Sequence, residues 1–248
     1  VGETGAGKST LAACLSGAVP HHYTGTFFGS VMVDGHDTCE VSLTDVSQIV
    51  GSVLQDIDTQ MVASVVEDEM LFGLENFGVP HDQIEQRVSE TLETVGISDL
   101  HDREIATLSG GQKQKVAIAA ILAMRPRVLV LDEPTAALDP ASSTLVFETL
   151  REANRALEIT IVVVEQKVAL LSEYCNRVLV LNHGEIALQG EPHEVFARTD
   201  ELRTIGVDCP RVTRIFNSLE TDGLVSGTPC LDVDEAERLI RGLVDPDR

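Results

Sequence analysis

The sequence has few basic residues. Its 18 lysines and arginines stand against 40 aspartates and glutamates, which gives a formal net charge of −22 at pH 7. A nucleic-acid-binding surface needs clustered positive charge to neutralise phosphates. Direct binding of DNA or RNA through a basic face is therefore disfavoured, and the acidic balance is typical of a highly soluble surface.

Long hydrophobic runs are also absent. The longest apolar candidates, residues 116–124 and 128–131, are separated by Arg125-Pro126-Arg127. A membrane-spanning helix needs about 20 consecutive apolar residues, so no span is predicted. The sequence has neither a signal peptide nor an initiating Met. We therefore expect a soluble chain that is a fragment of a longer one.

Paired metal ligands are missing as well. The five cysteines are scattered and form no C-x-x-C pair, which indicates reduced thiols rather than a disulfide framework or a zinc site. His21-His22 and His183 have no partner ligands at metal-binding spacing. We interpret these histidines as loop residues.

What the chain does contain begins at residue 2, with a match to G-x-x-x-x-G-K-[ST], the phosphate-binding P-loop. The motif comprises Gly2, Glu3, Thr4, Gly5, Ala6, Gly7, Lys8, Ser9 and Thr10. Its glycines let successive N–H groups turn inward around phosphate oxygens, and the helix expected over residues 11–15 adds the positive end of its dipole. Lys8 would reach the β- and γ-phosphates of a nucleotide, and the Ser9 hydroxyl would bind Mg²⁺.

Short runs rich in Val, Ile and Leu indicate strands buried on both faces of a parallel sheet. They are residues 128–131, 160–164 and 178–181. A helix is predicted after Asp139, its N-cap, with Pro140 in the first turn. Residues 182–184 predict a hairpin turn before an antiparallel edge strand at 185–188. Residues from about 56 to 125 and from about 194 onward are mostly helical, so the expected fold is α/β with a helical insertion and a helical C-terminal extension.

Two carboxylates, Asp132 and Glu133, end the first of these strands. Downstream of a P-loop, this pattern is typical of a Walker B element. Asp132 would hold Mg²⁺ directly or through water, and Glu133 would polarise the water that attacks the γ-phosphate.

A second phosphate site is predicted at the sequence Leu-Ser-Gly-Gly-Gln, residues 108–112. Ser109 is a helix N-cap, and Gly110 and Gly111 expose backbone N–H groups ahead of a helix over about 112–124. That helix points its positive end at whatever lies in front of Ser109. Gln112 completes the motif.

With Gln55 after a strand and the triplet Ala137-Leu138-Asp139, the chain resembles the ATP-binding cassette (ABC) ATPases over nearly its whole length. The resemblance implies a P-loop NTPase fold with a mostly parallel central sheet, and ATP and Mg²⁺ as cofactors. It further implies a head-to-tail dimer, in which the signature residues Ser109, Gly110, Gly111 and Gln112 serve the nucleotide of the partner. Gln55 would contact Mg²⁺ and sense the γ-phosphate, and Asp139 would link the two sites.

Within that family, residues 55–60, 67–76 and 206–212 are most similar to the ATPase subunits of energy-coupling factor transporters, which import vitamins and transition-metal ions. The likeness implies a peripheral protein on the cytoplasmic face of the cell membrane. Its helical subdomain, about 56–125, would grip a transmembrane coupling protein that works with a substrate-binding membrane protein. We expect an ABC ATPase domain at residues 1–195 and a C-terminal helical extension at 196–248 that helps two ATPases pair.

Two features depart from the family pattern. Gln166 stands where the family usually carries a histidine that contacts the γ-phosphate, and a glutamine cannot carry a proton or positive charge there. The exchange is either a tolerated substitution or the mark of a slower, asymmetric site paired with a more active subunit. The strand that enters the P-loop and the adenine-stacking aromatic would precede Val1, so the chain as written is expected to bind nucleotide weakly or fold poorly.

Other functions remain open from the sequence. A soluble ABC ATPase of DNA repair would carry a long coiled-coil or zinc insertion between P-loop and signature, which residues 11–107 lack, and a translation-type protein would carry two cassettes and a basic linker. Glu133 argues against a low-turnover regulatory subunit, whereas Gln166 favours one. The motifs name neither the transported substrate nor the choice between homodimer, heterodimer and half of a tandem protein.

Overall fold

The structure, a computed structural model, describes residues 1–23 and 25–244. The chain forms two compact units. One unit consists of Ser9–Val164, and the other combines Val1–Lys8 with the chain from Glu165 onward.

A three-stranded parallel sheet forms the centre of the Ser9–Val164 unit. Its strands are β3 (Val50–Val53), β4 (Val128–Asp132) and β5 (Thr160–Val164), in the order β3-β4-β5. The register places Val53 beside Leu131, and Asp132 beside Val164. The carboxyl ends of the strands therefore meet at one edge, where the loops that follow them begin.

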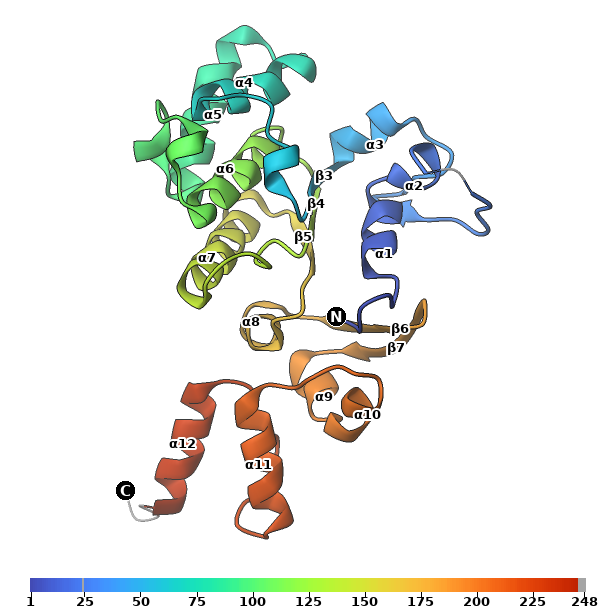
Figure 1. Cartoon of the computed structure of the whole chain (residues 1–248), viewed down its shortest axis with the longest axis vertical. Helices are drawn as coiled ribbons and strands as arrows, with labels where there is room; N and C mark the ends of the chain where they lie inside the picture. Colours follow the sequence, from blue (N-terminus) through green and yellow to red (C-terminus); the bar gives the residue numbers. More distant parts are fainter. Residues whose placement is uncertain (24, 245–248) are drawn as a thin grey trace. The chain divides into compact units, whose positions relative to one another are not determined.

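Helices cover both faces of this sheet, because successive side chains of a strand point to opposite faces. Leu129 and Leu131 join a core with α6 (Gly110–Leu122) and α7 (Pro140–Leu157). Val130 instead joins a core with α1 (Lys8–Leu15) and α3 (Leu43–Ile49). Figure 1 shows these two pairs of helices on opposite sides of the strands.

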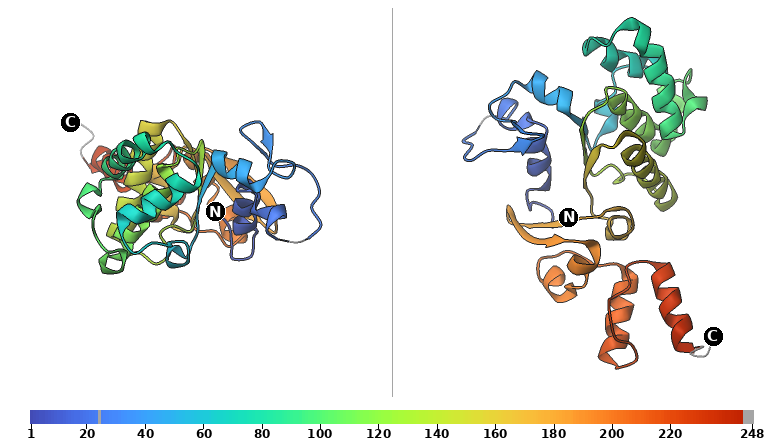
Figure 2. Two further views of the ribbon diagram at one scale, coloured as in Figure 1. Left: turned by 90° about the horizontal axis from the view of Figure 1, so that it is seen from above. Right: turned by 180° about the vertical axis from the view of Figure 1, so that it is seen from behind.

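The predicted helical insertion consists of α4 (Val66–Asn76), α5 (His81–Val95) and α6, with the short turns η1 (Ile57–Thr59), η2 (Ser98–Leu100) and η3 (Ile105–Thr107). The three helices contact one another, as Figures 1 and 2 show in teal and green. Their shared core includes the fully buried Met70, Leu74 and Ile118. Gly96, at a φ of 69°, ends α5 in the left-handed conformation that favours glycine.

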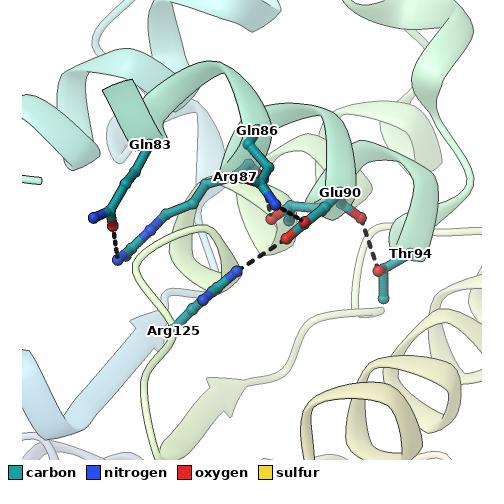
Figure 3. Close-up of polar contacts among 7 residues, drawn as sticks. Gln83, Gln86, Arg87, Glu90, Thr94 and Arg125 are labelled. Atoms are coloured by element: carbon teal, nitrogen blue, oxygen red, sulfur yellow. Dashed lines mark hydrogen bonds and ion pairs between the residues drawn. The ribbon is translucent and has the colours of Figure 1, made fainter. Parts of the chain in front are cut away.

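Exposed polar side chains run along the outer face of α5 (Figure 3). Glu90 accepts a hydrogen bond from Gln86 at 2.7 Å and forms an ion pair with Arg125 at 2.9 Å. Gln83 accepts from Arg87 at 3.1 Å. Arg125 and Glu90 are both about half exposed, so this contact ties the loop after α6 to α5 without large stabilisation.

Between α1 and α3 lie a short helix, α2 (Ala18–His21), and a two-stranded antiparallel ribbon of β1 (Met32–Val33) and β2 (His36–Asp37). The sequence pattern does not reveal this ribbon, because each strand is too short to show an alternation.

The other unit contains the antiparallel pair β6 (Val178–Asn182) and β7 (Glu185–Gly190), and Gly2 forms an isolated parallel bridge to Leu181. Its helices are α8 (Val168–Tyr174), α9 (Pro192–Phe196), α10 (Thr199–Thr204), α11 (Arg211–Thr221) and α12 (Val233–Val244). The last two helices pack around Phe216, Val225 and Cys230.

Most predicted elements are present, but the assignment of residues 178–181 to the parallel sheet is wrong, because they form β6, which pairs antiparallel with β7 in a separate sheet. The helix capped by Asp139, the hairpin at 182–184 and the antiparallel strand after it are confirmed. The signature helix begins at Gly110, two residues earlier than predicted, because Ser109 caps it directly. β5 differs from the prediction of a strand buried on both faces: Thr160 is exposed and the next three residues are half-buried, since β5 is an edge strand of the three-stranded sheet.

All five cysteines are free in the structure, and burial raises the pKa of each thiol above its ordinary value, to about 11 for Cys175. A raised pKa keeps a thiol protonated and unreactive.

Candidate nucleotide-binding site

The P-loop in the unit of residues 1–8 depends on glycine at its start. Gly2, Gly5 and Gly7 have φ angles of 154°, 84° and 98°, which side chains other than glycine's rarely allow. A Cβ atom on Gly2 would also lie 2.4 Å from the carbonyl oxygen of Leu181. The start of the loop therefore needs glycine both for its conformation and for its close approach to β6.

Lys8 is folded against the backbone of this loop. Its side chain is buried, and Nζ donates to the carbonyl oxygens of Gly2 at 3.0 Å and Glu3 at 3.1 Å. The loop itself is held by the Ala6 amide, which donates to Glu3 O at 3.0 Å, and by the Gly184 amide, which donates to Ala6 O at 3.0 Å. A lysine so placed brings one positive charge to the concave backbone that would receive phosphate oxygens.

In the Ser9–Val164 unit, the structure brings together Gln55 and Glu133, which are 78 residues apart in the sequence. Gln55 Nε2 donates to Glu133 Oε2 at 3.2 Å. Gln55 follows β3 and Glu133 follows β4, so the contact results from the parallel pairing of these two strands.

The backbone of Glu133 is held in an unusual conformation. Its φ of 48° lies in the left-handed region, and its amide donates to Val164 O at the end of β5, at 2.8 Å. A non-glycine residue in this region costs about 1–3 kcal/mol, and such strain is concentrated at functional sites. The end of β5 thus fixes the direction in which the Glu133 side chain leaves the sheet.

Asp132 provides an observation that bears on metal binding. Its Oδ1 is buried and has no hydrogen-bond partner among the described residues. A buried carboxylate oxygen without a partner is costly, and a cation would satisfy it. With the Ser9 hydroxyl and the Gln55 amide oxygen, Asp132 offers hard oxygen donors, which Mg²⁺ prefers. The residues present therefore fit a magnesium ion.

The signature residues form a capping box at the start of α6. Ser109 Oγ accepts from the Gln112 amide at 3.3 Å, and Gln112 Oε1 accepts from the Ser109 amide at 2.9 Å. A Cβ on Gly110 would lie 3.2 Å from Leu138 Cδ2, and a Cβ on Gly111 would lie 3.2 Å from Ser142 Cβ. The glycines therefore permit close packing of α6 against the start of α7.

Asp139 caps α7, as the sequence predicts. Its Oδ1 accepts from the Ser142 amide at 3.0 Å, and its Oδ2 accepts from Ser142 Oγ at 2.6 Å. These hydrogen bonds hold the pKa of the Asp139 carboxyl below its ordinary value, and the one from the Ser142 hydroxyl has the largest effect. Ser142 thus binds Asp139 and borders the space that a side chain at position 111 would occupy.

Gln166 is exposed, in a turn that a neighbouring residue organises. The side chain of Glu165 is buried, and its Oε1 accepts from the backbone amides of Gln166 at 2.8 Å and Lys167 at 3.3 Å. Sequence reasoning missed Glu165. The sequence signal that could have identified it is an acidic residue directly after the unbroken apolar strand of residues 160–164.

The placement of the predicted residues follows the division of the chain. Ser9, Thr10, Gln55, Asp132, Glu133, the signature and Asp139 belong to the Ser9–Val164 unit, whereas residues 2–8 and Gln166 belong to the other. Within the first set, contacts join Gln55 to Glu133 and the signature helix to the start of α7.

A groove lies beside α4, which we call the α4 groove. It has a volume of about 390 Å³ and is lined by Val62, Ala63, Asp68, Leu71, Phe72 and Glu75. Phe72 is 52% exposed and Val62 is 61% exposed, so two large apolar side chains face solvent there. Sequence reasoning identified the helix but not the groove, because Val62 and Ala63 come from the preceding loop.

Comparisons with known proteins agree on one family. The model of the ABC transporter family matches residues 1–136. The energy-coupling factor transporter ATP-binding protein EcfA1 of Symbiobacterium thermophilum is 42% identical over 238 residues, which cover 95% of this chain and 80% of the relative. EcfA1 of Clostridium perfringens strain 13 is 38% identical over 236 residues, with 95% and 82% covered. The structure of cbiO1 from Clostridium perfringens, part of the ABC transporter complex cbiONQ, superimposes with a TM-score of 0.74 at 35% identity, over 89% of this chain and 85% of that one.

Proposed function

We propose that this chain, an ATPase of the ABC transporter family that is similar to the ATP-binding subunits of energy-coupling factor transporters, drives uptake of a vitamin or a transition-metal ion. The contact between Gln55 and Glu133 carries the proposal. It joins Gln55, in the loop that leads to the α4 groove, with Glu133, the residue that would activate water. This contact supports the proposal that the chemistry of ATP and the contact with a partner use neighbouring parts of the chain.

The backbone amides of residues 2–10 would bind the phosphates, with Lys8 on the β- and γ-phosphates. Ser9, Gln55 and Asp132 would hold Mg²⁺, which would neutralise charge on the phosphate oxygens when bound. Glu133 would orient and polarise the attacking water, and the strained backbone at this residue would fix its carboxylate for that task. Gln166 would donate a hydrogen bond to the γ-phosphate.

The signature residues would act on the nucleotide of a second ATPase subunit. Ser109 and Gly110 are exposed at the N-terminus of α6, where the positive end of the helix dipole favours an anion. Asp139 is also exposed, at the N-terminus of α7. We therefore propose a head-to-tail dimer, as either a homodimer or a heterodimer, with one signature facing each bound ATP.

The α4 groove would receive a transmembrane coupling protein, which in turn would work with a substrate-binding membrane protein. Exposed Phe72 and Val62 offer apolar contact, and Asp68 and Glu75 in the lining favour basic residues on the partner. Such docking would hold the chain at the cytoplasmic face of the membrane. Among the described residues, no helix combines the length and apolar character that a bilayer crossing requires.

Co-purification tests this function. The full-length protein, expressed with the genes that neighbour its own, is expected to extract from membranes together with transmembrane proteins. F72D should abolish that association. F28D is the matched control, because Phe28 is 88% exposed and does not line the groove. Equal recovery of membrane partners with F72D and F28D would refute docking at the α4 groove.

A further inference from the structure

Three side chains that can bind a metal ion gather where the segment after η2 meets the start of α4. Glu67 comes from the first turn of α4, and His101 and Asp102 directly follow η2. One ligand atom from each of the three lies within 4.8 Å of the other two. Across residues 1–23 and 25–244, this is the one group of three His, Cys, Asp or Glu side chains that could hold a metal ion in this way.

Backbone hydrogen bonds fix the positions of Glu67 and His101 relative to each other. The Glu67 amide donates to His101 O at 3.1 Å, and the Val66 amide donates to Arg103 O at 3.1 Å. All of these residues belong to the Ser9–Val164 unit. The two side chains are therefore carried by directly paired backbone segments, although they lie far apart in the sequence.

The hydrogen bond between His101 and Asp102 leaves one ring nitrogen free to act as a ligand. His101 Nδ1 lies 2.6 Å from Asp102 Oδ1. An ionised carboxylate only accepts, so Nδ1 carries the proton and the neutral ring presents the lone pair of Nε2. Histidines that bind metal ions almost always donate their other ring N–H in this manner, often to a carboxylate. Asp102 thus orients the ring as a metal site requires.

The free nitrogen faces Glu67 at a distance that favours an intervening ion. His101 Nε2 and Glu67 Oε1 are 3.9 Å apart, whereas a hydrogen bond needs about 2.7–3.2 Å. Two ligands that each lie about 2.0–2.1 Å from one ion are separated by up to roughly 4 Å. The side chains of His101 and Glu67 are 36% and 45% exposed, so water can fill the remaining coordination positions.

The donor atoms select the class of ion. An imidazole nitrogen suits Zn²⁺, Co²⁺ and Ni²⁺, whereas Mg²⁺ prefers oxygen ligands. We propose that His101 Nε2 and Glu67 bind a divalent transition-metal ion, which ties the start of α4 to the segment after η2, and that Asp102 is the positioning residue for His101. The proposal goes beyond the proposed function, because neither ATP nor a membrane partner takes part in this site.

Calorimetric titration of the full-length protein with Zn²⁺, in an excess of Mg²⁺ that occupies sites made of oxygen alone, tests the proposal. The wild type should bind one Zn²⁺ that Mg²⁺ does not displace, and H101Q and E67A should lose this binding. D102N should retain it with an affinity about 10–100-fold lower, the usual effect of removing the partner that orients a ligand. Zn²⁺ should also raise the Tm of the wild type but not that of H101Q, since an ion that binds the folded state stabilises it.

H193Q is the matched control. His193 Nε2 also faces a glutamate, but it contacts Glu235 directly at 3.2 Å, so H193Q should bind Zn²⁺ as the wild type does. Electron paramagnetic resonance of bound Cu²⁺ gives a readout that does not depend on stability, because an imidazole nitrogen splits the copper signal. The splitting assigned to the site should be lost in H101Q and persist in H193Q.

The metal site is overturned if the wild type shows no Zn²⁺ binding that resists Mg²⁺, or if H101Q or E67A binds Zn²⁺ with unchanged affinity. An unchanged affinity in D102N would overturn the positioning role of Asp102. These results are independent of ATP turnover and of the co-purification of F72D and F28D, so the site and the proposed function can fail separately.

Discussion

Substitution of Gly111 by alanine is expected to destabilise the protein through its contact with α7. The added methyl group would lie 3.2 Å from Ser142 Cβ and 3.3 Å from Ser142 Oγ, closer than ordinary van der Waals contact. Ser142 cannot turn away cheaply, because its amide and hydroxyl both bind Asp139. Overpacking of this kind costs about 1–3 kcal/mol, and for a chain of this size each kcal/mol lowers Tm by roughly 2–4 °C.

The matched control is G73A in α4. A Cβ there would meet the flexible side chain of Met124, with Sδ at 3.4 Å, which is ordinary contact. Alanine is favoured over glycine in a helix interior by about 0.5–1 kcal/mol, so G73A should hold or raise Tm. Because the two substitutions are chemically identical, their difference isolates the contact with Ser142.

Thermal unfolding followed by circular dichroism measures both variants, and S142G supplies the second arm. S142G removes the Cβ and Oγ that crowd the new methyl group, so G111A should cost less stability in S142G than in the wild type. If G111A is as stable as G73A, or equally costly in both backgrounds, the signature glycine is not needed for packing against α7.

Three further outcomes follow from the same geometry. E133Q should lower kcat for ATP hydrolysis by about 10²-fold or more, the usual contribution of a general base, and leave ATP binding measurable by calorimetry; unchanged turnover would remove Glu133 from the mechanism. Hydrogen bonds lower the pKa of Asp139 in the folded state, so its contribution to stability is complete above the ordinary aspartate pKa and is lost as pH falls through the lowered folded value. The Tm difference between wild type and D139A should therefore shrink in acid. A Tm difference that does not depend on pH would contradict this. Q166H should raise ATP turnover in the assembled transporter if glutamine slows the site, and an unchanged rate would favour a tolerated substitution.

The fold was largely predictable because its signals are local. Continuous apolar runs indicate buried strands such as residues 128–131, and Asp139 and Pro140 indicate the start of α7. Even the proximity of Gln55 and Glu133 follows from parallel strands that end at one edge of a sheet. The exposure of β5 was not predictable, since the apolar content of a strand does not say how many neighbours pair with it.

Contacts that depend on two distant side chains lay beyond the sequence. The sequence around Gln60 is that of an ordinary loop, and only the structure shows its hydrogen bonds to Ser52 of β3 and to Leu54, which follows β3. In the sequence, Glu69 is one of three acidic residues predicted in the first turn of a helix, and the helix dipole is a sufficient reason for an acidic residue there. Its burial and its hydrogen bonds to Val62 and Ala63 require coordinates, because they depend on the path of the loop before the helix.

The distribution of lysine explains how so acidic a chain can bind a polyanion. Its four lysines are Lys8 of the P-loop, Lys113 and Lys115 on the signature helix, and Lys167 next to Gln166. Lys113 is paired with Asp58 at 2.7 Å, and Lys115 donates to Val95 O at 3.2 Å, so both have structural partners. Charge on the remote surface is screened within about 8 Å at physiological salt. At the proposed site, attraction of ATP would therefore depend on the local field of Lys8, the backbone amides and the start of α1, rather than on the net charge of −22.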